Sequence, residues 1–327
     1  MQQVHHPQAR KLEAQETEGK GTVLRALVTG GAGFIGSHLV DRLLADGDSV
    51  SVIDDLSTGS SNNVPPHAQL HRVDIGDWNS LRDVVTAFRP DVVFHAAAQT
   101  DVGRSIREPD YDARVNVLGA LNVLRAAHAA GARRIVYASS AAVYGSPERL
   151  PVPETHPTRP LSDYGSSKLA FEHYLHAYQA RGLIEYAALR FANVYGPRQR
   201  SDGEGGVVAI FADGMLAGKP VTIFGDGTKT RDYIYVGDVV DAVIRAASGP
   251  GGVIANLGWG REVSDLELFR EVAAATRYTQ EPTYAADRPG DIAHSCLDAA
   301  VARQTWGWKP TVALRDGVRR VVEWSER

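Results

Sequence analysis

Short apolar runs and amphipathic segments alternate along the chain from residue 23 onward. The apolar runs are rich in Val and Ile, as expected of strands that are buried on both faces of a sheet. They span 23–30, 49–54, 69–74, 91–97, 133–140 and 184–196. The segments between them carry apolar residues at helical spacing, and several end at a glycine. The alternation predicts a doubly wound α/β fold, in which helices cover both faces of a parallel sheet.

The pattern changes after about residue 190, where charged, loop-rich stretches separate short mixed elements. We therefore expect a main domain over 23–190 and a smaller α/β lobe over 191–327. Residues 234–260 resemble a further helix and strand, and we predict that they return to the main sheet. No repeat or flexible linker separates the two parts, so they should share an interface.

Composition narrows the classes of partner. The chain has 43% hydrophobic and 23% charged residues and a net charge of −4, which gives no basic surface for nucleic acid or an anionic membrane. No apolar run approaches the roughly 20 residues of a membrane span. Residues 1–22 lack the apolar centre of a signal peptide and predict a disordered polar tail.

The cysteine and the histidines at positions 5, 6 and 95 indicate no disulfide, metal site or catalytic group. The single cysteine, Cys296, excludes an internal disulfide and suits a reducing cytoplasm, where a small core residue is a better interpretation than a reactive thiol. His5 and His6 are too isolated to indicate a metal site, and no metal is expected. We interpret His95 as a packed residue at a strand end rather than a catalyst.

A glycine-rich turn between the first strand and the first helix is the first chemical motif. In "VTGGAGFIGSHLV", Gly30 permits a tight turn, Gly33 lets the backbone approach a pyrophosphate, and Gly36 allows close helix–strand packing. Asp54 ends the second strand, eighteen residues after Gly36. A carboxylate there accepts hydrogen bonds from a ribose and repels a 2′-phosphate, which predicts NAD rather than NADP in a Rossmann-type domain. The alternative is a structural glycine turn with an incidental aspartate cap.

Two aspartates follow the third strand. Asp74 is placed to meet an adenine, although it could instead cap the helix that follows. For Asp77 the helix cap is the better interpretation.

Ser140, Tyr164 and Lys168 form the second motif. Tyr164 and Lys168 lie four residues apart in a predicted helix and so share one face. An ammonium and a positive nicotinamide nearby would favour the phenolate and lower the pKa of Tyr164. Lysine is rare here, with none between Lys20 and Lys219 except Lys168. Ser140 ends the fifth predicted strand, at the edge where such sheets bind ligands, and its hydroxyl can bridge a substrate and the Tyr164 oxygen.

With these motifs, the chain resembles the extended short-chain dehydrogenase/reductase family, and within it the UDP-glucose (UDP-galactose) 4-epimerases of actinobacterial type. The resemblance runs from about residue 23 to 325. It is carried by "LVTGGAGFIGSHLVDRLL", "HAAAQTDVGRSIREP", "NVLGALNVL", "ASSAAVYG", "YGSSKLAFE", "RFANVYGPRQ", "GDGTKTRDYIYVGDVVDA" and "RPGDIAHSCLD".

The resemblance implies an isomerase with a tightly held NAD that is reduced and reoxidised in each turnover. Tyr164 would take the proton from the sugar O4 while the C4 hydride passes to NAD, which leaves a 4-keto sugar. The ketone would turn over and receive the hydride on its other face. Ser140 would assist the proton transfer, and Lys168 would tune Tyr164 and hold the ribose.

The resemblance also implies a set of cofactor contacts beyond the motifs already described. These are Phe34, Ile35, Asp55, Ser57, Thr58, Gly59, Ile75, Ala96, Ala97, Ala98, Asn116 and Phe191. Residues 191–327 would form the nucleotide-sugar lobe, with Asn193 on the diphosphate and the backbone of Val207 on uridine. Thr222 and Phe224 would flank uracil.

The remaining implied substrate contacts are polar. Arg231 and Arg288 would clamp the phosphates, and Asp291 would accept from a uridine ribose hydroxyl. For either arginine, a surface ion pair is the alternative. Ser295 would leave room for an N-acetyl group, because a bulky residue at this position closes the pocket in related epimerases.

Two alanines narrow the reaction. Relatives that eliminate water or decarboxylate carry an acid directly after the catalytic serine, whereas this chain has Ala141 and Ala142. The favoured function is a UDP-hexose 4-epimerase. The alternatives are a UDP-glucuronate 4-epimerase and a catalytically idle NAD- or nucleotide-sugar-binding protein. The resemblance further implies a homodimer that pairs the helices around 112–130 and 164–181, although their apolar residues could equally serve the chain's own core.

Overall fold

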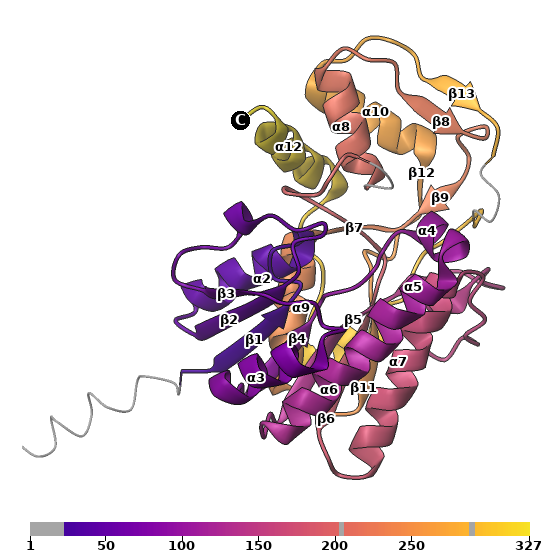
Figure 1. The fold of residues 1–327 in the computed structure, drawn as a ribbon. Helices are drawn as coiled ribbons and strands as arrows, with labels where there is room; N and C mark the ends of the chain where they lie inside the picture. The colour runs from indigo at the N-terminus through magenta and orange to yellow at the C-terminus, as the bar shows by residue number, and fades with distance from the viewer. Residues whose placement is uncertain (1–22, 203–205, 288–291) are drawn as a thin grey trace, which may run out of the picture.

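The computed structural model describes residues 23–202, 206–287 and 292–327. The predicted tail over 1–22 lies outside the described residues. A seven-stranded sheet in the order β11-β6-β5-β4-β1-β2-β3 forms its centre (Figure 1). Its strands are β1 (Arg25–Thr29), β2 (Ser49–Asp54), β3 (Gln69–Arg72), β4 (Val92–His95), β5 (Arg134–Ser140), β6 (Glu185–Phe191) and β11 (Val253–Leu257). Every neighbouring pair is parallel, which confirms the predicted doubly wound fold.

Side chains alternate across the sheet and build two cores. Ala26 and Val28 of β1 point to one core, and Leu27 points to the other. The first core is covered by α2 (Phe34–Ala45), α9 (Val236–Ser248) and α11 (Ala300–Trp306). The second is covered by α3 (Trp78–Phe88), α6 (Ala120–Ala129) and α7 (Asp163–Ala180). The apolar runs therefore reflect burial on both faces of each central strand.

The strand register sets where the ligand edge lies. Thr29 at the end of β1 pairs with Ile53 of β2 on one side and with His95 of β4 on the other. From β1, the strands β2 and β3 are added on one side of the sheet, and β4, β5 and β6 are added on the other, so the strand order reverses at β1. The carboxyl ends of β1, β2, β4 and β5 form one edge. Ligands of open α/β sheets bind in the crevice at this reversal.

Two predicted elements are interrupted in the structure. The run 184–196 divides into β6 and β7 (Asn193–Tyr195), and β7 leaves the central sheet to pair with β10 (Tyr233–Tyr235). The helix predicted around 112–130 starts as α5 (Pro109–Ala113) and continues through a π-helical segment, η2 (Arg114–Gly119), into α6. Short π segments in helices often accompany functional sites.

The second lobe packs around a third core. Helices α8 (Val207–Leu216), α10 (Asp265–Thr276) and α12 (Leu314–Ser325) enclose it and lie together beyond one end of the sheet (Figure 1). The remaining short elements are η1 (Ser61–Asn63), α4 (Val102–Arg107), η3 (Ala141–Tyr144), β8 (Thr222–Phe224), β9 (Thr230–Arg231), β12 (Val263–Ser264) and β13 (Thr283–Ala285). Since α9 and β11 follow this lobe's first elements and still pack in the sheet layer, the division of the chain at residue 190 stays a prediction.

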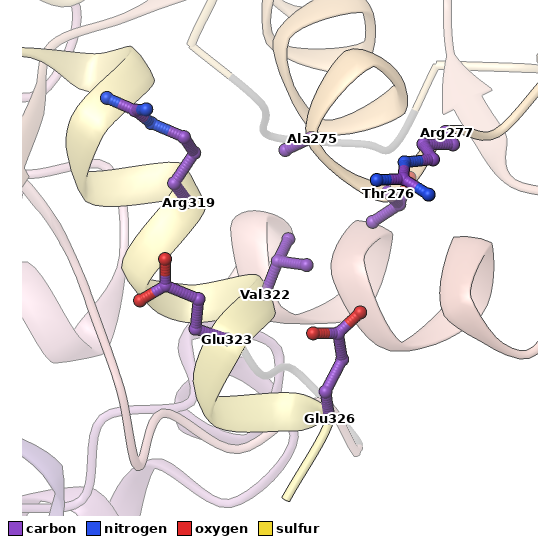
Figure 2. A pocket seen from close by; sticks show the side chains of 7 residues that line it. All are labelled: Ala275, Thr276, Arg277, Arg319, Val322, Glu323 and Glu326. Atoms are coloured by element: carbon purple, nitrogen blue, oxygen red, sulfur yellow. The ribbon is translucent and has the colours of Figure 1, made fainter.

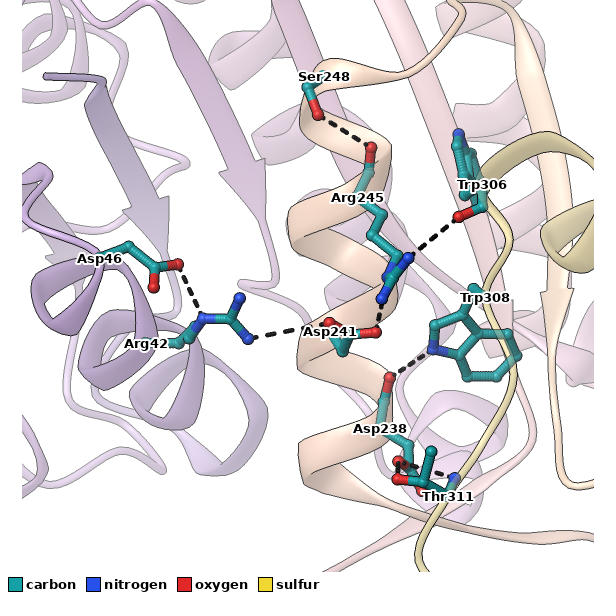
Figure 3. A network of polar contacts seen from close by, with 9 residues as sticks. All are labelled: Arg42, Asp46, Asp238, Asp241, Arg245, Ser248, Trp306, Trp308 and Thr311. Atoms are coloured by element: carbon teal, nitrogen blue, oxygen red, sulfur yellow. Dashed lines mark hydrogen bonds and ion pairs between the residues drawn. The ribbon is translucent and has the colours of Figure 1, made fainter. Parts of the chain in front are cut away.

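Polar contacts fix α9 between α2 and the C-terminal segment (Figure 3). Asp241 lies 3.9 Å from Arg42 of α2. The Asp238 carbonyl accepts from Trp308 Nε1 at 2.9 Å, and its carboxylate accepts from the Thr311 backbone and hydroxyl at 3.0 and 2.8 Å. The helix that returns to the sheet is thereby held from both sides.

Asp232 joins the two parts of the molecule. It is fully buried and accepts from the backbone N–H groups of Trp259, Gly260 and Leu297 at 2.8 to 3.1 Å. Burial raises the pKa of Asp232 to about 6 against these three bonds. The carboxylate thus fixes the turn after β11 against the strand-like segment that ends at Leu297.

No helix among the described residues is long and apolar enough to cross a membrane.

Candidate active site

A cavity of about 1890 Å³ opens at the reversal point of the sheet. It is lined by the β1–α2 turn, the ends of β2 to β5, the helices from α4 to α6, residues between 194 and 202, and Gly206. Most of the predicted cofactor contacts line it: Gly30, Gly33, Phe34, Ile35, Gly36, Asp54, Asp55, Ser57, Thr58, Asp74, Ile75, Ala96, Ala97, Ala98, Tyr164, Lys168 and Phe191. Within the described part of the chain, Gly59 and Asn116 are not among its lining residues, and their contacts with a cofactor stay predictions.

The glycine turn has no room for side chains. Gly30 adopts a φ of +73°, and a Cβ there would lie 2.5 Å from the backbone nitrogen of Ala97. A Cβ on Gly36 would fall on the carbonyl oxygen of Gly30. Gly33 is the N-cap of helix α2 and provides no side-chain cap, and the first residues of the helix line the cavity. This bare helix start fits a pyrophosphate, as a dinucleotide cofactor requires.

Asp54 has two functions at this turn. Its carboxylate accepts from the N–H groups of Ala32 and Leu56, both at 2.9 Å, and it lines the cavity. Burial raises the pKa of Asp54, while the two hydrogen bonds lower it. A carboxylate offers about four lone-pair sites, so a ribose hydroxyl can still donate to it. The aspartate cap and the ribose contact are therefore compatible.

The structure confirms the predicted cap at Asp77, while the contact of Asp74 with an adenine stays a prediction. The Asp77 carboxylate caps α3 by accepting from Asn79 and Ser80. Asp74 accepts from Gly76 N at 2.7 Å and lines the cavity.

Ser140, Tyr164 and Lys168 come together at the carboxyl end of β5. Ser162 caps α7 by accepting from Gly165 N at 3.1 Å, which orients the first turn that carries Tyr164. The Ser140 hydroxyl lies beside the Tyr164 side chain. Burial raises the pKa of Tyr164, and the interaction with Ser140 lowers it. The lowering expected from Lys168 together with a nicotinamide stays a prediction.

Lys168 is 3% exposed, beneath Tyr164. Its Nζ donates to the carbonyl oxygen of Ala138 at 2.9 Å and lies 5.0 and 5.7 Å from the ring centres of Tyr137 and Tyr164. Burial lowers the pKa of Lys168 to about 8. His95 is buried against the same ring of Tyr137, and burial lowers its pKa to about 3, which supports its interpretation as a packed residue.

A buried ion pair lies one turn further along α7, which the sequence analysis did not assign. Glu172 accepts from Arg190 Nε at 3.0 Å and Nη2 at 2.6 Å, and both side chains are almost fully buried. Ser139, next to Ser140, donates to the same carboxylate at 2.6 Å. Arg190 also donates to Tyr144 at 2.9 Å. The pair thus fixes the strand end that carries Ser140. Its sequence signal is the spacing of Tyr164, Lys168 and Glu172 at four-residue steps on one helix face.

Aromatic and basic side chains missed by the sequence analysis also line the cavity. Arg104 stacks on Tyr111 at 3.8 Å, and Arg114 lies 5.2 Å from the same ring. From the second lobe, Arg200 donates to the Thr58 carbonyl at 3.2 Å. Of these residues, only Arg104 falls within a motif quoted for the resemblance, and no spacing rule assigned any of them a function.

The predicted substrate contacts other than Ser140 and Tyr164 belong to the second lobe, and those that the structure describes are not among the residues that line the cavity. Asn193 starts β7, Val207 starts α8, and Thr222 and Phe224 lie in β8. Arg231 ends β9, beside Ser295, whose N–H donates to the Thr230 carbonyl at 3.2 Å. Arg288 and Asp291 lie outside the described residues. The geometry therefore brings Arg231 and Ser295 close together, and the substrate roles of the whole set stay predictions.

A second hollow of about 440 Å³ lies between the ends of α10 and α12 (Figure 2). Arg277, Arg319, Glu323 and Glu326 surround it. Its charges of both signs are exposed, and none of the residues of the glycine turn or of the Ser140, Tyr164 and Lys168 group lines it, so the larger cavity is the candidate site. Among the described residues, no cluster of His, Cys, Asp or Glu could hold a metal ion.

A bare helix start in a dinucleotide crevice, with Ser140, Tyr164 and Lys168 beside it, defines an NAD-binding enzyme of the extended short-chain dehydrogenase/reductase class. Residues 26–258 match the NAD dependent epimerase/dehydratase family. The chain belongs to this family, which confirms the resemblance and the choice of NAD as cofactor.

Within this family, the chain is similar to several UDP-glucose 4-epimerases. The UDP-glucose 4-epimerase of Mycolicibacterium smegmatis is 46% identical over 308 residues, which cover 92% of this chain and 98% of that protein. The structure of UDP-glucose 4-epimerase with UDP-glucose from Thermotoga maritima has a TM-score of 0.90 and 42% identity, and covers 92% of this chain and 98% of that one. The Thermus thermophilus UDP-glucose 4-epimerase complex with NAD has a TM-score of 0.88 and 43% identity, with the same coverage.

The lysine itself is testable. We expect Lys168→Arg to lower kcat by about tenfold or more and to speed cofactor loss, because a planar guanidinium cannot replace a compact ammonium against the Ala138 carbonyl. Steady-state kinetics and the absorbance of retained cofactor measure both effects. Lys219→Arg, at an exposed position of the second lobe, is the matched control. A fully active Lys168→Arg variant with normal cofactor content would show that charge alone suffices.

Proposed function

We propose that this protein is an NAD-dependent 4-epimerase that interconverts UDP-glucose and UDP-galactose. The observation that carries the proposal is the placement of Ser140 beside Tyr164, with the buried Lys168 next to the tyrosine ring, at the wall of a cavity that fits a dinucleotide. The relatives named above are UDP-glucose 4-epimerases at 42 to 46% identity. They favour this function over a UDP-glucuronate epimerase or an idle binding protein.

The side chains supply proton transfer and positioning. Tyr164 removes the proton from the sugar O4 as C4 is oxidised, and returns it when C4 is reduced from the other face. Ser140 donates to the Tyr164 oxygen and so stabilises its ionised form. Lys168 provides a fixed positive charge beneath the ring. When bound, NAD supplies the acceptor and donor of the C4 hydride.

The position after Ser140 restricts the reaction to epimerisation. Ala141 and Ala142 open η3, and the Ala142 N–H donates to Ser140 Oγ at 3.2 Å. Neither methyl group can transfer a proton. Elimination and decarboxylation need such a group beside the sugar, so the 4-keto sugar is left to accept hydride again.

The second lobe is proposed to hold the UDP group. Arg231 would contact the diphosphate, with Arg288, and Asn193 and Val207 would contact the diphosphate and uridine. Thr222 and Phe224 would flank uracil, and Asp291 would accept from the uridine ribose. The adjacency of Arg231 and Ser295 around Thr230 supports a common sugar–phosphate site.

Activity without added cofactor tests the function. Purified protein mixed with UDP-galactose, and no NAD, should form UDP-glucose, because a tightly held cofactor is regenerated in each turnover. Tyr164→Phe should lower the rate by at least about 10²-fold, since it removes the proton-transfer group. Absence of turnover of any UDP-hexose, even with NAD supplied, would instead indicate a binding protein.

Ser295 tests the width of the sugar pocket. We expect UDP-N-acetylgalactosamine to be a substrate, because a small side chain leaves room at the sugar C2 substituent. Ser295→Tyr should abolish turnover of the N-acetylated sugar by filling that room and should spare UDP-galactose, whereas Ser295→Ala should spare both. The ratio of the two kcat/KM values is the measurement, and negligible turnover of the N-acetylated sugar by the native protein would contradict the idea.

A homodimer through η2, α6 and α7 is the proposed assembly. Phe171 and Leu175 of α7 serve the chain's own core, but Tyr174 is 42% exposed on the same helix, and Leu118 of η2 is 58% exposed. Such exposed apolar residues on neighbouring helices suit a helix-to-helix contact.

Sedimentation equilibrium tests this assembly. The native protein should sediment as a dimer and Tyr174→Arg as a monomer, because a charge would be buried in the contact. Tyr284→Arg, at an exposed tyrosine of β13, is the control and should leave the dimer intact. A native monomer at micromolar concentration would contradict the proposal.

The buried free thiol of Cys296 is compatible with the proposed cytoplasmic location. Fractionation of cells that produce the native protein, with recovery outside the cytoplasm, would contradict it.

A further inference from the structure

Asp112 is a buried carboxylate that the reaction described above does not use. It lies in α5 and is 1% exposed. Its Oδ1 accepts from Gln99 Nε2 at 2.8 Å and from Asn116 Nδ2 at 3.0 Å. Its Oδ2 is also buried and, among the described residues, has no hydrogen-bond partner. A buried carboxylate oxygen without a donor is costly unless a cation offsets its charge.

The buried charges around α7 show which cation is available. Arg190 is paired with Glu172 through two hydrogen bonds of 3.0 and 2.6 Å. Among the described charged side chains buried next to α7, the remaining ones are the cation Lys168 and the anion Asp112. The Lys168 ammonium donates to a neutral carbonyl, that of Ala138. Helices α5 and α7 pack against each other, so the two remaining charges lie in one low-dielectric region.

Hydrogen bonds fix Asp112 relative to the reacting tyrosine. Asn116, which donates to Asp112, also donates to Ser167 Oγ at 3.2 Å, and Ser167 donates to the Tyr164 carbonyl at 3.0 Å. Gln99 connects Asp112 to the cavity wall that it lines. Two donors, Gln99 and Asn116, therefore fix the Asp112 carboxylate through its Oδ1, and Asn116 connects it to the lysine helix.

We propose that Asp112 is the buried counter-charge of Lys168, a positioning residue that keeps the ammonium protonated beneath Tyr164. The inference deepens the proposed function and rests on it for its catalytic consequence. The four buried charges then sum to zero, which removes much of the cost of placing an ammonium at the reaction centre.

The surrounding groups agree with this assignment. Burial lowers the pKa of Lys168 to about 8, and the charge of Asp112, followed by that of Glu172, raises it. The charge of Asp112 also raises the pKa of Tyr164. The other titratable groups that face Lys168 are Tyr137 of β5, whose pKa is raised by burial, and His95 of β4, which is neutral at pH 7.

The sign of the expected effect follows from these interactions. Without the negative charge, the pKa of Lys168 falls, and the ammonium loses its proton at a lower pH. The pKa of Tyr164 falls as well, because its phenolate no longer faces an anion. Both limbs of the kcat–pH profile should therefore move to lower pH.

Asp112→Asn is the decisive variant, because it keeps the shape and the Oδ1 acceptor and removes only the charge. Lysine labelled with ¹³C gives six signals in this chain, which has six lysines, and Lys168→Arg identifies the signal of Lys168. We expect the Lys168 titration midpoint to fall by about one pH unit in Asp112→Asn. Asp110→Asn removes the same charge from an exposed position of α5 and should leave the midpoint unchanged.

The two readouts separate this proposal from the proposed function. An unchanged Lys168 midpoint in Asp112→Asn overturns the counter-charge, whatever the enzyme does. A lowered midpoint with no UDP-hexose turnover in the native protein supports the counter-charge and rejects the epimerase. Activity reduced equally at every pH, with an unchanged midpoint, shows a purely structural carboxylate. If Asp112→Asn does not fold, Asp112→Ser is measured in the same way, with the same outcomes.

Discussion

The constraint on which this site depends is the burial of one ammonium group. Lys168 lies at 3% exposure, where an unpaired charge costs several kcal/mol. The protein offsets this cost with a carbonyl oxygen at 2.9 Å, with two tyrosine rings, and with carboxylates on two helices. Burial raises the pKa of the Tyr164 phenol and lowers the pKa of the Lys168 ammonium, so it favours the neutral form of each group. A neighbouring ammonium in turn favours the ionised phenol. The tyrosine and lysine are thus adjacent for an electrostatic reason.

The sheet topology brings the remaining groups to this charge. Reversal of the strand order at β1 places the glycine turn, Asp54 and the loop after β4 at one edge. Ser140 reaches the same edge because β5 continues beyond the last residue that pairs with β4, Tyr137, and ends at Ser140. Helix α7 then returns across β5, and its first two turns carry Tyr164 and Lys168 over the strand end. The glycines are required by this closeness, since a methyl on Gly36 would overlap the Gly30 carbonyl.

The sequence predicted the local part of this arrangement and missed the long-range part. Strand–helix alternation and the spacing of Gly30, Gly33 and Gly36 identified the fold and the cofactor edge, because each depends on neighbouring residues. Tyr164 and Lys168 are detectable for the same reason. The Glu172–Arg190 pair joins a helix to a strand, and Asp112 meets Gln99 only after β4 and α5 pack. The four-residue spacing of Tyr164, Lys168 and Glu172 marks Glu172 as a charged residue on a buried helix face, but no local pattern identifies its partner Arg190 or the contact between Asp112 and Gln99. The break of 184–196 into β6 and β7 likewise depends on pairing with β10, which is distant in the chain.

The buried charges explain why position 190 is an arginine and position 168 is a lysine. The chain uses arginine at most basic positions, and Arg190 is the arginine of the buried network, where its planar fork holds Glu172 through two fixed bonds. The guanidinium of Arg190 stays charged, and its two hydrogen bonds hold it in one orientation. The reaction centre needs the opposite properties: a compact charge whose proton affinity responds to nearby carboxylates and to the tyrosine. Lysine meets that need, because its pKa moves readily on burial. The paired Arg190 and Glu172 thus stabilise the structure, while Lys168 and Asp112 set the protonation state of the site.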